Sequence, residues 1–265
     1  MIKKFINLFL KKKVVKLYEL PERVLNKINY FLQFPRAGFG RHFVDKFIKE
    51  ISKEFDKDGQ ILLDVGAGHQ PYKKNFKKIK YESCDSDNVI KEIKYDILNA
   101  KHDFYCNINE HIPRNDKYYD VVLCSEVLEH VYNPENVIKE ISRILKDDGV
   151  FIATIPQSMG EHMLPHNYFN YLGPGILYLL KKNNLKALSL KKYSGVFHAT
   201  GNLLNKLVNT VFFIDRNLVT KIIFFPLEFI VRIFVAIINI ILFYLDKFDT
   251  TKSWSLHYFL IAKKN

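Results

Sequence analysis

The sequence has little cysteine and no long uncharged apolar run, and each shortage excludes a class of protein. The 265-residue chain contains three cysteines, Cys84, Cys106 and Cys124, an odd number with no metal-type spacing. The odd number excludes a disulfide framework, and the spacing predicts no metal site. We therefore expect buried reduced thiols, which suit a cytoplasmic protein. The longest uncharged apolar run, Ile233–Leu245, has 13 residues, whereas a helix that spans a bilayer needs about 20. A simple transmembrane protein is therefore not expected.

Acidic residues are also scarce, because 28 Asp and Glu stand against 40 Lys and Arg, which gives a net charge of +12. Such an excess favours an anionic partner, either nucleic acid or lipid headgroups. A solvated lysine-rich surface is the plain alternative. No RNA-binding module of aromatic and basic residues is evident, so nucleic acid is not favoured. Residues 1–36 place lysines among apolar residues at helical spacing, which predicts one or two basic amphipathic helices that either cap the fold or lie on a membrane surface.

The most informative stretch is Ile61–Gly68, an apolar run that contains Asp64 and ends in Gly66-Ala67-Gly68. This pattern predicts a buried parallel strand followed by a glycine turn. The two glycines let a ligand approach the backbone closely and permit a positive φ. Ligands of open α/β sheets bind at the carboxyl ends of the strands, so we expect a binding site here.

A second acidic residue, Asp85, follows Asp64 by 21 residues and ends the next predicted strand. A carboxylate at about this spacing hydrogen-bonds the ribose hydroxyls in nucleoside-binding α/β folds. A surface aspartate at a strand end is the alternative. Pro71 stands where a dinucleotide fingerprint needs glycine or alanine, which argues against a nicotinamide-dependent oxidoreductase, a competing interpretation. The pattern therefore favours a nucleoside without a pyrophosphate.

Strands and helices alternate over the middle of the chain, which predicts a parallel sheet with right-handed crossovers. Asn133 as N-cap and Pro134 at the first position predict a helix that stops at Asp147–Gly149. The other expected elements are helices over 41–55 and 176–182 and strands over 60–65, 79–85, 103–106, 118–124, 150–155, 186–190 and 257–262. The expected parts are N-terminal helices over 1–57, a core over 58–192, an apolar helical insertion over 193–250, and the last strand of the core over 251–265.

The chain resembles class I S-adenosylmethionine-dependent methyltransferases, most of all the type-11 methyltransferase domain. The similar residues are Asp64–Gly68, Asp85 and the run Tyr119–Val131, which includes the sequence Leu-Glu-His-Val. The resemblance covers about residues 58–192 and the last strand. It implies an α/β fold with a Rossmann-like seven-stranded sheet, mostly parallel with an antiparallel last strand. It also implies S-adenosyl-L-methionine as the cofactor over the strand ends.

The resemblance implies a set of cofactor-binding residues that follow the strands: Asp64, Gly66, Gly68, Asp85, Asn107, Ser125 and Glu126. The two glycines would line the methionine part of the cofactor, and Asp64 would orient its ammonium group through water. Asp85 would hold the ribose. Asn107 stands near the position of the family's adenine-binding aspartate, and Ser125 and Glu126 would border the adenosine pocket.

Methyl transfer from a sulfonium depends on alignment and desolvation. A general base is needed only if the acceptor must lose a proton. His130, His162 and His166 are the candidate bases, and a structural role is the alternative for each. The segment Glu161–Tyr171 resembles a motif of related enzymes, with asparagines where an aspartate and an arginine are usual. Tyr168 in this segment is a candidate residue of the acceptor pocket.

Residues 203–245 are strongly apolar, and Pro226, Glu228 and Arg232 interrupt the last part. Either a helical hairpin lies in one leaflet of a membrane, or an ordinary insertion packs on the sheet or forms a dimer interface. Because the last strand of the core follows, both ends of the segment should lie on the same side, which disfavours a single span.

We therefore predict a methyltransferase that acts on a hydroxyl or amine of a small, lipid-linked or otherwise amphiphilic acceptor. We expect it in the cytoplasm, peripheral on the inner face of the cell membrane, with membrane contact through 1–36 and 203–245. Three alternatives stay open: a non-catalytic membrane adaptor on a degenerate methyltransferase fold, a nicotinamide-dependent oxidoreductase, and an RNA methyltransferase.

Overall fold

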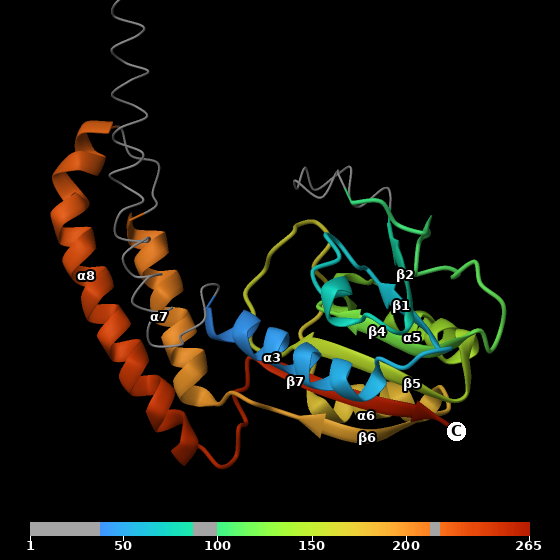
Figure 1. Ribbon diagram of the computed structural model, residues 1–265. Coiled ribbons are helices and arrows are strands. Elements are labelled where there is room, and N and C mark those ends of the chain that lie inside the picture. The colour runs from blue at the N-terminus through green and yellow to red at the C-terminus, as the bar shows by residue number, and fades with distance from the viewer. Residues whose placement is uncertain (1–37, 87–99, 213–217) are drawn as a thin grey trace, which may run out of the picture. The chain divides into compact units, whose positions relative to one another are not determined.

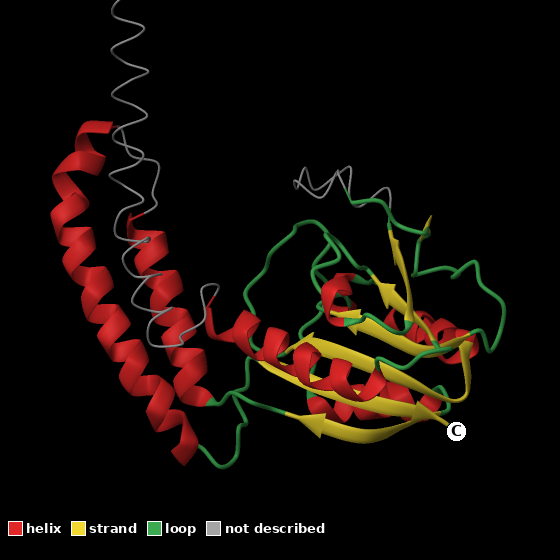
Figure 2. Cartoon of the chain, viewed as in Figure 1, coloured by secondary structure: helices red, strands yellow, loops and turns green. Residues whose placement is uncertain are grey.

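The computed structural model describes residues 38–86, 100–212 and 218–265, and the helices predicted over 1–36 lie outside these residues. The chain divides into two compact units. We refer to Phe43–Tyr193 with Trp254–Asn265 as the sheet unit, and to Ser194–Ser253 with the residues before Phe43 as the helical unit. Figure 2 shows all the strands in the sheet unit and a pair of long helices in the helical unit.

The sheet unit contains a seven-stranded sheet in the order β3-β2-β1-β4-β5-β7-β6 (Figure 1). Its strands are β1 Ile61–Val65, β2 Lys80–Asp85, β3 Phe104–Tyr105, β4 Tyr119–Ser125, β5 Leu145–Pro156, β6 Leu185–Lys191 and β7 His257–Lys264. The first five strands pair in parallel, and β7 runs antiparallel to both β5 and β6. This topology confirms the predicted fold class. The strand order reverses between β1 and β4, which is where ligands bind in such sheets.

Helices cover both faces of this sheet. The helices of the unit are α3 Gly38–Phe55, of which Phe43 onward belongs here, α5 Pro134–Ile144 and α6 Gly173–Lys182, with short 3-10 turns η1 Lys73–Asn75 and η3 Leu128–His130. On one face, α5 and α6 bury Ile138, Ile141 and Leu180 in a core shared with β1 and β4. On the other face, the Phe47 ring of α3 lies 5.1 Å from the Phe259 ring of β7. Three layers therefore fix the strand ends in place.

Helix α5 begins as predicted and ends earlier than predicted. The Asn133 side chain accepts a hydrogen bond from the Asn136 N–H, and Pro134 is the first helical residue. The helix ends at Ile144 and β5 begins at Leu145, so the predicted stop at Asp147–Gly149 and strand start at Val150 are wrong. The chain enters the sheet at once because the Tyr118 N–H donates to the carbonyl of Ile144. The extra residues form an irregularity in the β4–β5 ladder.

The cysteines are free, as predicted. Cys84 and Cys124 are buried in β2 and β4, whereas Cys106 is only half-buried because it follows the two-residue edge strand β3. Helix α6 begins at Gly173, three residues earlier than predicted, with Pro174 in its first turn.

The helical unit contains α7 Val196–Phe212 and α8 Leu218–Leu245, followed by the 3-10 turn η4 Asp246–Phe248. Figure 1 shows α7 and α8 side by side. These helices occupy the segment that the sequence predicts as an apolar insertion.

Candidate active site

The glycine turn after β1 places its two glycines in different surroundings. Both have a positive φ, 66° at Gly66 and 51° at Gly68. A Cβ added to Gly66 would lie 2.5 Å from a methyl carbon of Val127, whereas a Cβ added to Gly68 would meet nothing within 4 Å. Gly66 is thus required by the close approach of the segment after β4, and Gly68 borders open space that a ligand could fill.

The Asp85 carboxylate is fixed against the glycine turn. Its Oδ2 accepts a hydrogen bond of 2.8 Å from the Gly68 N–H, and its Oδ1 accepts one of 2.7 Å from the Ser86 N–H. Each carboxylate oxygen can accept a further hydrogen bond. Asp85 therefore both shapes the turn and offers acceptors for a pair of hydroxyl groups.

Asp64 lies beneath the turn in β1 and is almost fully buried. Burial raises the pKa of its carboxyl from the ordinary value of 3.8 to about 7; a hydrogen bond from the Tyr81 hydroxyl opposes this shift, and the nearby Asp85 charge adds to it. A cationic ligand group near Asp64 would favour its ionised form.

The unusual pKa of Asp64 predicts a pH-dependent cost to folding. A carboxyl with a raised native pKa contributes stability that is full below pH 4 and is lost as the pH rises through about 7. The difference between 3.8 and about 7 corresponds to roughly 4 kcal/mol. The Asp64→Asn variant keeps an acceptor for Tyr81. Its free energy of unfolding should therefore rise relative to that of wild type as the pH increases from 5 to 8. Urea titrations at each pH measure the difference, and a constant difference would contradict the prediction.

Ser125 and Glu126, at the end of β4, are tied to the two strands that follow in the sheet. The Ser125 hydroxyl lies 2.8 Å from the Thr154 hydroxyl of β5, which also donates to Glu126 Oε1 at 2.8 Å. Glu126 Oε2 lies 2.9 Å from Nε2 of the buried His257 in β7. Thr154 and His257 were missed in the sequence. A hydroxyl within an apolar strand could have indicated a site role for Thr154. No local pattern indicated a role for His257, because it lies far along the chain from the other site residues.

The η3 turn places Glu129 and His130 just after β4. Burial raises the pKa of Glu129 well above its ordinary value, and repulsion from Glu126 adds to this. His130 Nδ1 lies 2.5 Å from the carbonyl oxygen of His166. Because a carbonyl only accepts hydrogen bonds, Nδ1 carries the proton and Nε2 keeps a free lone pair. Burial lowers the pKa of His130, so this ring is neutral at pH 7.

The segment after β5 brings the other predicted residues to His130. The His162 ring lies 4.8 Å from the His130 ring, and His166 Nδ1 lies 3.3 Å from the Tyr168 hydroxyl. The segment is held in place by the Tyr168 N–H, which donates to the carbonyl of Glu129 at 2.8 Å. The structure therefore brings His130, His162, His166 and Tyr168 into one cluster.

This cluster contains a set of groups that could hold a metal ion. Glu129, His130 and His162 each place one ligand atom within 4.8 Å of the others. One carboxylate and two imidazoles suit several divalent cations. The sequence predicted no metal because no cysteine or histidine spacing indicated one; the three residues come from two separate segments.

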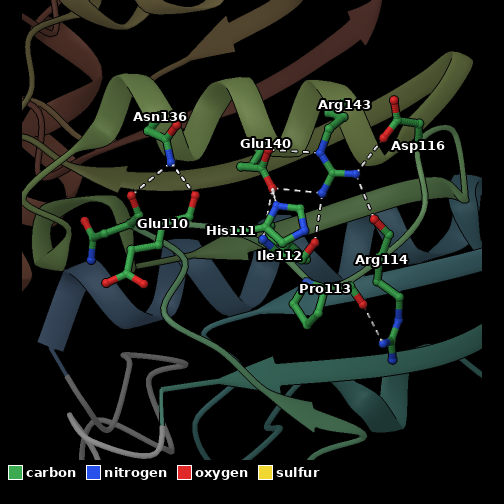
Figure 3. A network of polar contacts seen from close by, with 10 residues as sticks. Glu110, His111, Ile112, Pro113, Arg114, Asp116, Asn136, Glu140 and Arg143 are labelled. Carbon is green, nitrogen blue, oxygen red and sulfur yellow. Dashed lines mark hydrogen bonds and ion pairs between the residues drawn. The ribbon is translucent and has the colours of Figure 1, made fainter.

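Asn107 follows β3 and uses its side chain within its own turn. Its Nδ2 donates to Glu110 Oε1 at 2.8 Å, and its Oδ1 accepts the Asn109 N–H at 3.1 Å. The segment after it is fixed to α5 by the network in Figure 3, where the Asn136 amide donates to the carbonyl oxygens of Asn109 and Glu110. α5 thereby positions the backbone beside the predicted adenine site.

The Glu140–Arg143 pair is the centre of this network (Figure 3). Arg143 donates to Glu140 at 2.8 Å and to the carbonyl oxygens of Ile112 and Arg114. Burial alone would raise the pKa of Glu140, but its hydrogen bonds from Arg143 and the Ile112 N–H outweigh this and lower it. The pair therefore contributes stability that is present above the ordinary pKa of glutamate and lost as the pH falls below it.

Removal of the Arg143 guanidinium should destabilise the protein strongly. In Arg143→Met the buried Glu140 carboxylate loses the guanidinium and keeps only its other donors, and the carbonyl oxygens of Ile112 and Arg114 lose the Arg143 N–H groups. We therefore expect a loss of about 3 kcal/mol in the free energy of unfolding at pH 7. Lys139→Met, an exposed substitution in the same helix, should change it by less than about 0.5 kcal/mol. Urea denaturation measures both, and equal effects would contradict the assigned role.

A family model and curated proteins match this chain. The methyltransferase domain family matches residues 36–192. The chain is 39% identical over 140 residues to a ubiquinone biosynthesis O-methyltransferase of Vibrio atlanticus (strain LGP32), which covers 52% of this chain and 53% of that protein. The match to a ubiquinone biosynthesis O-methyltransferase of Pelagibacter ubique (strain HTCC1062), 28% identical over 156 residues and 51% of this chain, spans 64% of that protein, so the chain matches only part of the length of these relatives.

Two solved structures have a similar fold. The cyclase SpnF has a TM-score of 0.51 with 17% identity, covering 82% of this chain and 80% of SpnF. A candidate sarcosine dimethylglycine methyltransferase of Galdieria sulphuraria also has a TM-score of 0.51, with 16% identity and coverage of 84% and 86%. At these identities the likeness concerns the fold alone, since one fold carries different chemistries.

Proposed function

Because this chain belongs to the methyltransferase domain family, we propose that it transfers a methyl group from S-adenosyl-L-methionine to a hydroxyl group of a small acceptor. The family supports the cofactor and the reaction class. The similarity to an O-methyltransferase supports a hydroxyl rather than an amine. The observation that carries the proposal is the neutral His130 ring, with its Nε2 lone pair free, in the turn after β4.

The residues around the glycine turn fit this cofactor. The open space at Gly68 would admit it, and the Asp85 carboxylate keeps acceptor capacity for a ribose diol. The partly ionised Asp64 would stabilise a cationic ammonium group. Ser125 and Glu126 would line the adenosine side, with Asn107 near the adenine. When bound, the cofactor supplies an activated methyl group on a sulfonium.

His130 would act as the general base. Its Nε2 would take the proton of the acceptor hydroxyl, while Nδ1 stays bonded to the carbonyl of His166 and holds the ring in one tautomer. Oε1 of Glu129 lies 3.7 Å from Nε2, beyond hydrogen-bond distance, so it would leave that lone pair to the acceptor hydroxyl. Tyr168, His162 and His166 would line the acceptor side. Alignment of the hydroxyl and exclusion of water would supply the rest of the rate enhancement.

The acceptor would be amphiphilic, because exposed apolar residues are common in this chain and its net charge is positive. Such an acceptor would suit a protein at the inner face of the cell membrane, with contact through residues 1–36 and 203–245. Membership of the methyltransferase family argues against the nicotinamide-dependent oxidoreductase. An RNA methyltransferase would use the same cofactor, and the lack of an RNA-binding module of aromatic and basic residues in the sequence argues against it. The non-catalytic adaptor is the remaining alternative, and it differs from the enzyme in a single measurable property.

The property that separates the enzyme from the adaptor is turnover. The protein is incubated with S-adenosyl-L-methionine and a panel of phenols with alkyl chains of increasing length, and S-adenosylhomocysteine is quantified. We expect product with at least one free phenol and none with the matched methyl ether, whose oxygen is already blocked. Turnover only with the corresponding amines would overturn the choice of a hydroxyl. Cofactor binding without turnover on any acceptor would favour the adaptor.

A further inference from the structure

The α7–α8 hairpin buries several polar residues and leaves many apolar residues exposed. The carboxylate of Glu228 and the amide of Asn239 are buried, although both belong to the long apolar helix α8. In contrast, α5 in the sheet unit buries Val137, Ile138 and Ile141. A helix pair that folds in water buries its apolar face, whereas α8 buries these polar groups and exposes many apolar residues.

Polar pairs join the two helices along their length. Arg232 donates to the Glu228 carboxylate at 2.8 Å on its own helix and to the Asn209 side-chain oxygen of α7 at 3.1 Å. The Asn239 amide donates to Asn205 at 2.9 Å. At the end of the hairpin, His198 Nδ1 lies 2.7 Å from Asp246. A small apolar cluster of Val208, Phe212 and Val235 packs between these pairs. Interhelical polar pairs of this kind hold helices together in lipid, where apolar side chains gain nothing by facing each other.

The outward face of α8 is an apolar stripe at alternating intervals of three and four residues. Its exposed members are Leu227, Ile230, Phe234, Ile237, Ile241 and Tyr244. On α7, Leu203, Leu207 and Val211 are exposed at intervals of four. Among the described helices, only Pro226–Phe248 is long and apolar enough to cross a membrane, and 17% of its most apolar window is buried. Such a large exposed apolar surface indicates a site that contacts another protein or a membrane.

The flanks of the stripe favour lipid over a second helix. Spacing by three and four residues also occurs in coiled coils, but there charged residues flank the apolar seam and face water. On α8 the half-exposed flanks are Ile233, Ile238 and Ile240, and no charged residue lies between Ile233 and Leu245. A dimer through the stripe would leave these flanks in water, whereas a bilayer would cover them as well.

We propose that the α7–α8 hairpin inserts into one leaflet of an anionic membrane, with the apolar stripe in the acyl region and the polar pairs between its helices. The chain enters the hairpin at Ser194 and leaves it at Ser253, and both flanks continue into the sheet unit. The hairpin therefore enters and leaves on the same side. Residues 1–37 carry nine Lys and Arg and two Asp and Glu, a balance that anionic headgroups attract. This inference deepens the membrane contact that the proposed function assigns to residues 203–245, and its test does not depend on cofactor binding or turnover.

Flotation of the full-length protein with vesicles of equal parts phosphatidylglycerol and phosphatidylcholine tests the inference. We expect wild type to float and Ile237→Lys/Ile241→Lys to partition at least about 100-fold less, because each lysine must leave water. Leu188→Lys is the matched control, since Leu188 of β6 is 56% exposed, against 51% for Ile237, and lies outside the hairpin. It should float as wild type does.

A second measurement does not depend on the lysine variants being folded. In Trp254→Phe, which removes the single natural tryptophan, a tryptophan introduced by Ile237→Trp should be quenched by lipids brominated along the acyl chain. Absence of quenching, or a wild-type protein that stays in the soluble fraction, would overturn the inference. A concentration-dependent dimer that the two lysines disrupt, without flotation, would also overturn it and would identify a second copy as the occupant.

Discussion

His130→Asn is expected to lower the turnover number by about 100- to 10,000-fold, the usual contribution of a general base. The asparagine amide can replace Nδ1 as donor to the carbonyl of His166, so the segment around Tyr168 should stay in place. The group that the substitution removes is Nε2. Affinity for S-adenosyl-L-methionine should change by less than about threefold, because the cofactor residues lie in the turn after β1 and at the ends of β2 and β4. Turnover and cofactor titration on the same preparation measure both.

The pH dependence of turnover and substitutions of the other two histidines test whether His130 is the base. Burial holds the pKa of His130 below its ordinary value of 6.5, so wild-type turnover should be constant above pH 7 and fall on acidification. His130→Asn should lose that acidic limb. His162→Asn and His166→Asn should each lower turnover less, and a larger loss at either would assign the base to that residue instead. An effect of EDTA on wild type would identify Glu129, His130 and His162 as metal ligands.

Gly66→Ala should destabilise the protein by about 3 kcal/mol or more, whereas Gly68→Ala should cost only about 1 kcal/mol. Both positions have a positive φ, which costs an alanine roughly 1–2 kcal/mol. Only at Gly66 would the new Cβ also collide with Val127, at 2.5 Å. Cofactor affinity should fall at both positions, at Gly68 by at least tenfold, because its Cβ would project into the space proposed for the ligand. Urea denaturation and calorimetric titration separate the two effects.

The double variant Gly66→Ala/Val127→Ala tests the cause of the first effect. If the collision with Val127 is responsible, trimming that side chain should restore part of the lost stability, and the double-mutant cycle should give a favourable coupling of at least about 1 kcal/mol. Additive losses would show that the backbone conformation alone is responsible. Equal stability of Gly66→Ala and Gly68→Ala would contradict the distinction between the two glycines.

The parts of the site that sequence predicted well are those set by local pattern. The apolar run that contains Asp64, the glycine turn and the spacing to Asp85 belong to one strand-turn-strand unit, β1 to β2. The N-cap at Asn133 is equally local. The parallel sheet follows from alternating strands and helices, and the antiparallel last strand from the family resemblance. Roles of individual site residues stay predictions, as does the finer type-11 assignment.

The contacts that sequence could not predict join segments far apart in the chain. Glu126 lies beside His257 of the last strand, and Asp85 accepts hydrogen bonds from the backbone of the turn in addition to the acceptors that it offers a ligand. Gly66 owes its place to Val127 at least as much as to a cofactor. The early start of β5 was missed because Asp147, Asp148 and Gly149 are typical of a turn, and here they form an irregularity within a strand.

The polarity of the hairpin was likewise beyond local pattern. The sequence shows Glu228 and Arg232 as interruptions of an apolar segment, and these residues could face water or each other. Only the structure pairs Arg232 with Asn209 and Asn239 with Asn205 across two helices. A periodicity of apolar residues cannot reveal which face of a helix is covered when nearly every face is apolar.

The central claim is that the turn after β1 and the end of β2 bind S-adenosyl-L-methionine. Isothermal titration of the cofactor into wild type and Asp85→Ala tests it most directly, with unfolding curves to verify that both are folded. We predict saturable one-to-one binding to wild type that is weakened at least about 100-fold in Asp85→Ala, because the variant loses the ribose acceptors and the bond that holds Gly68. Unchanged affinity in the folded variant, or no binding to wild type, would contradict the claim.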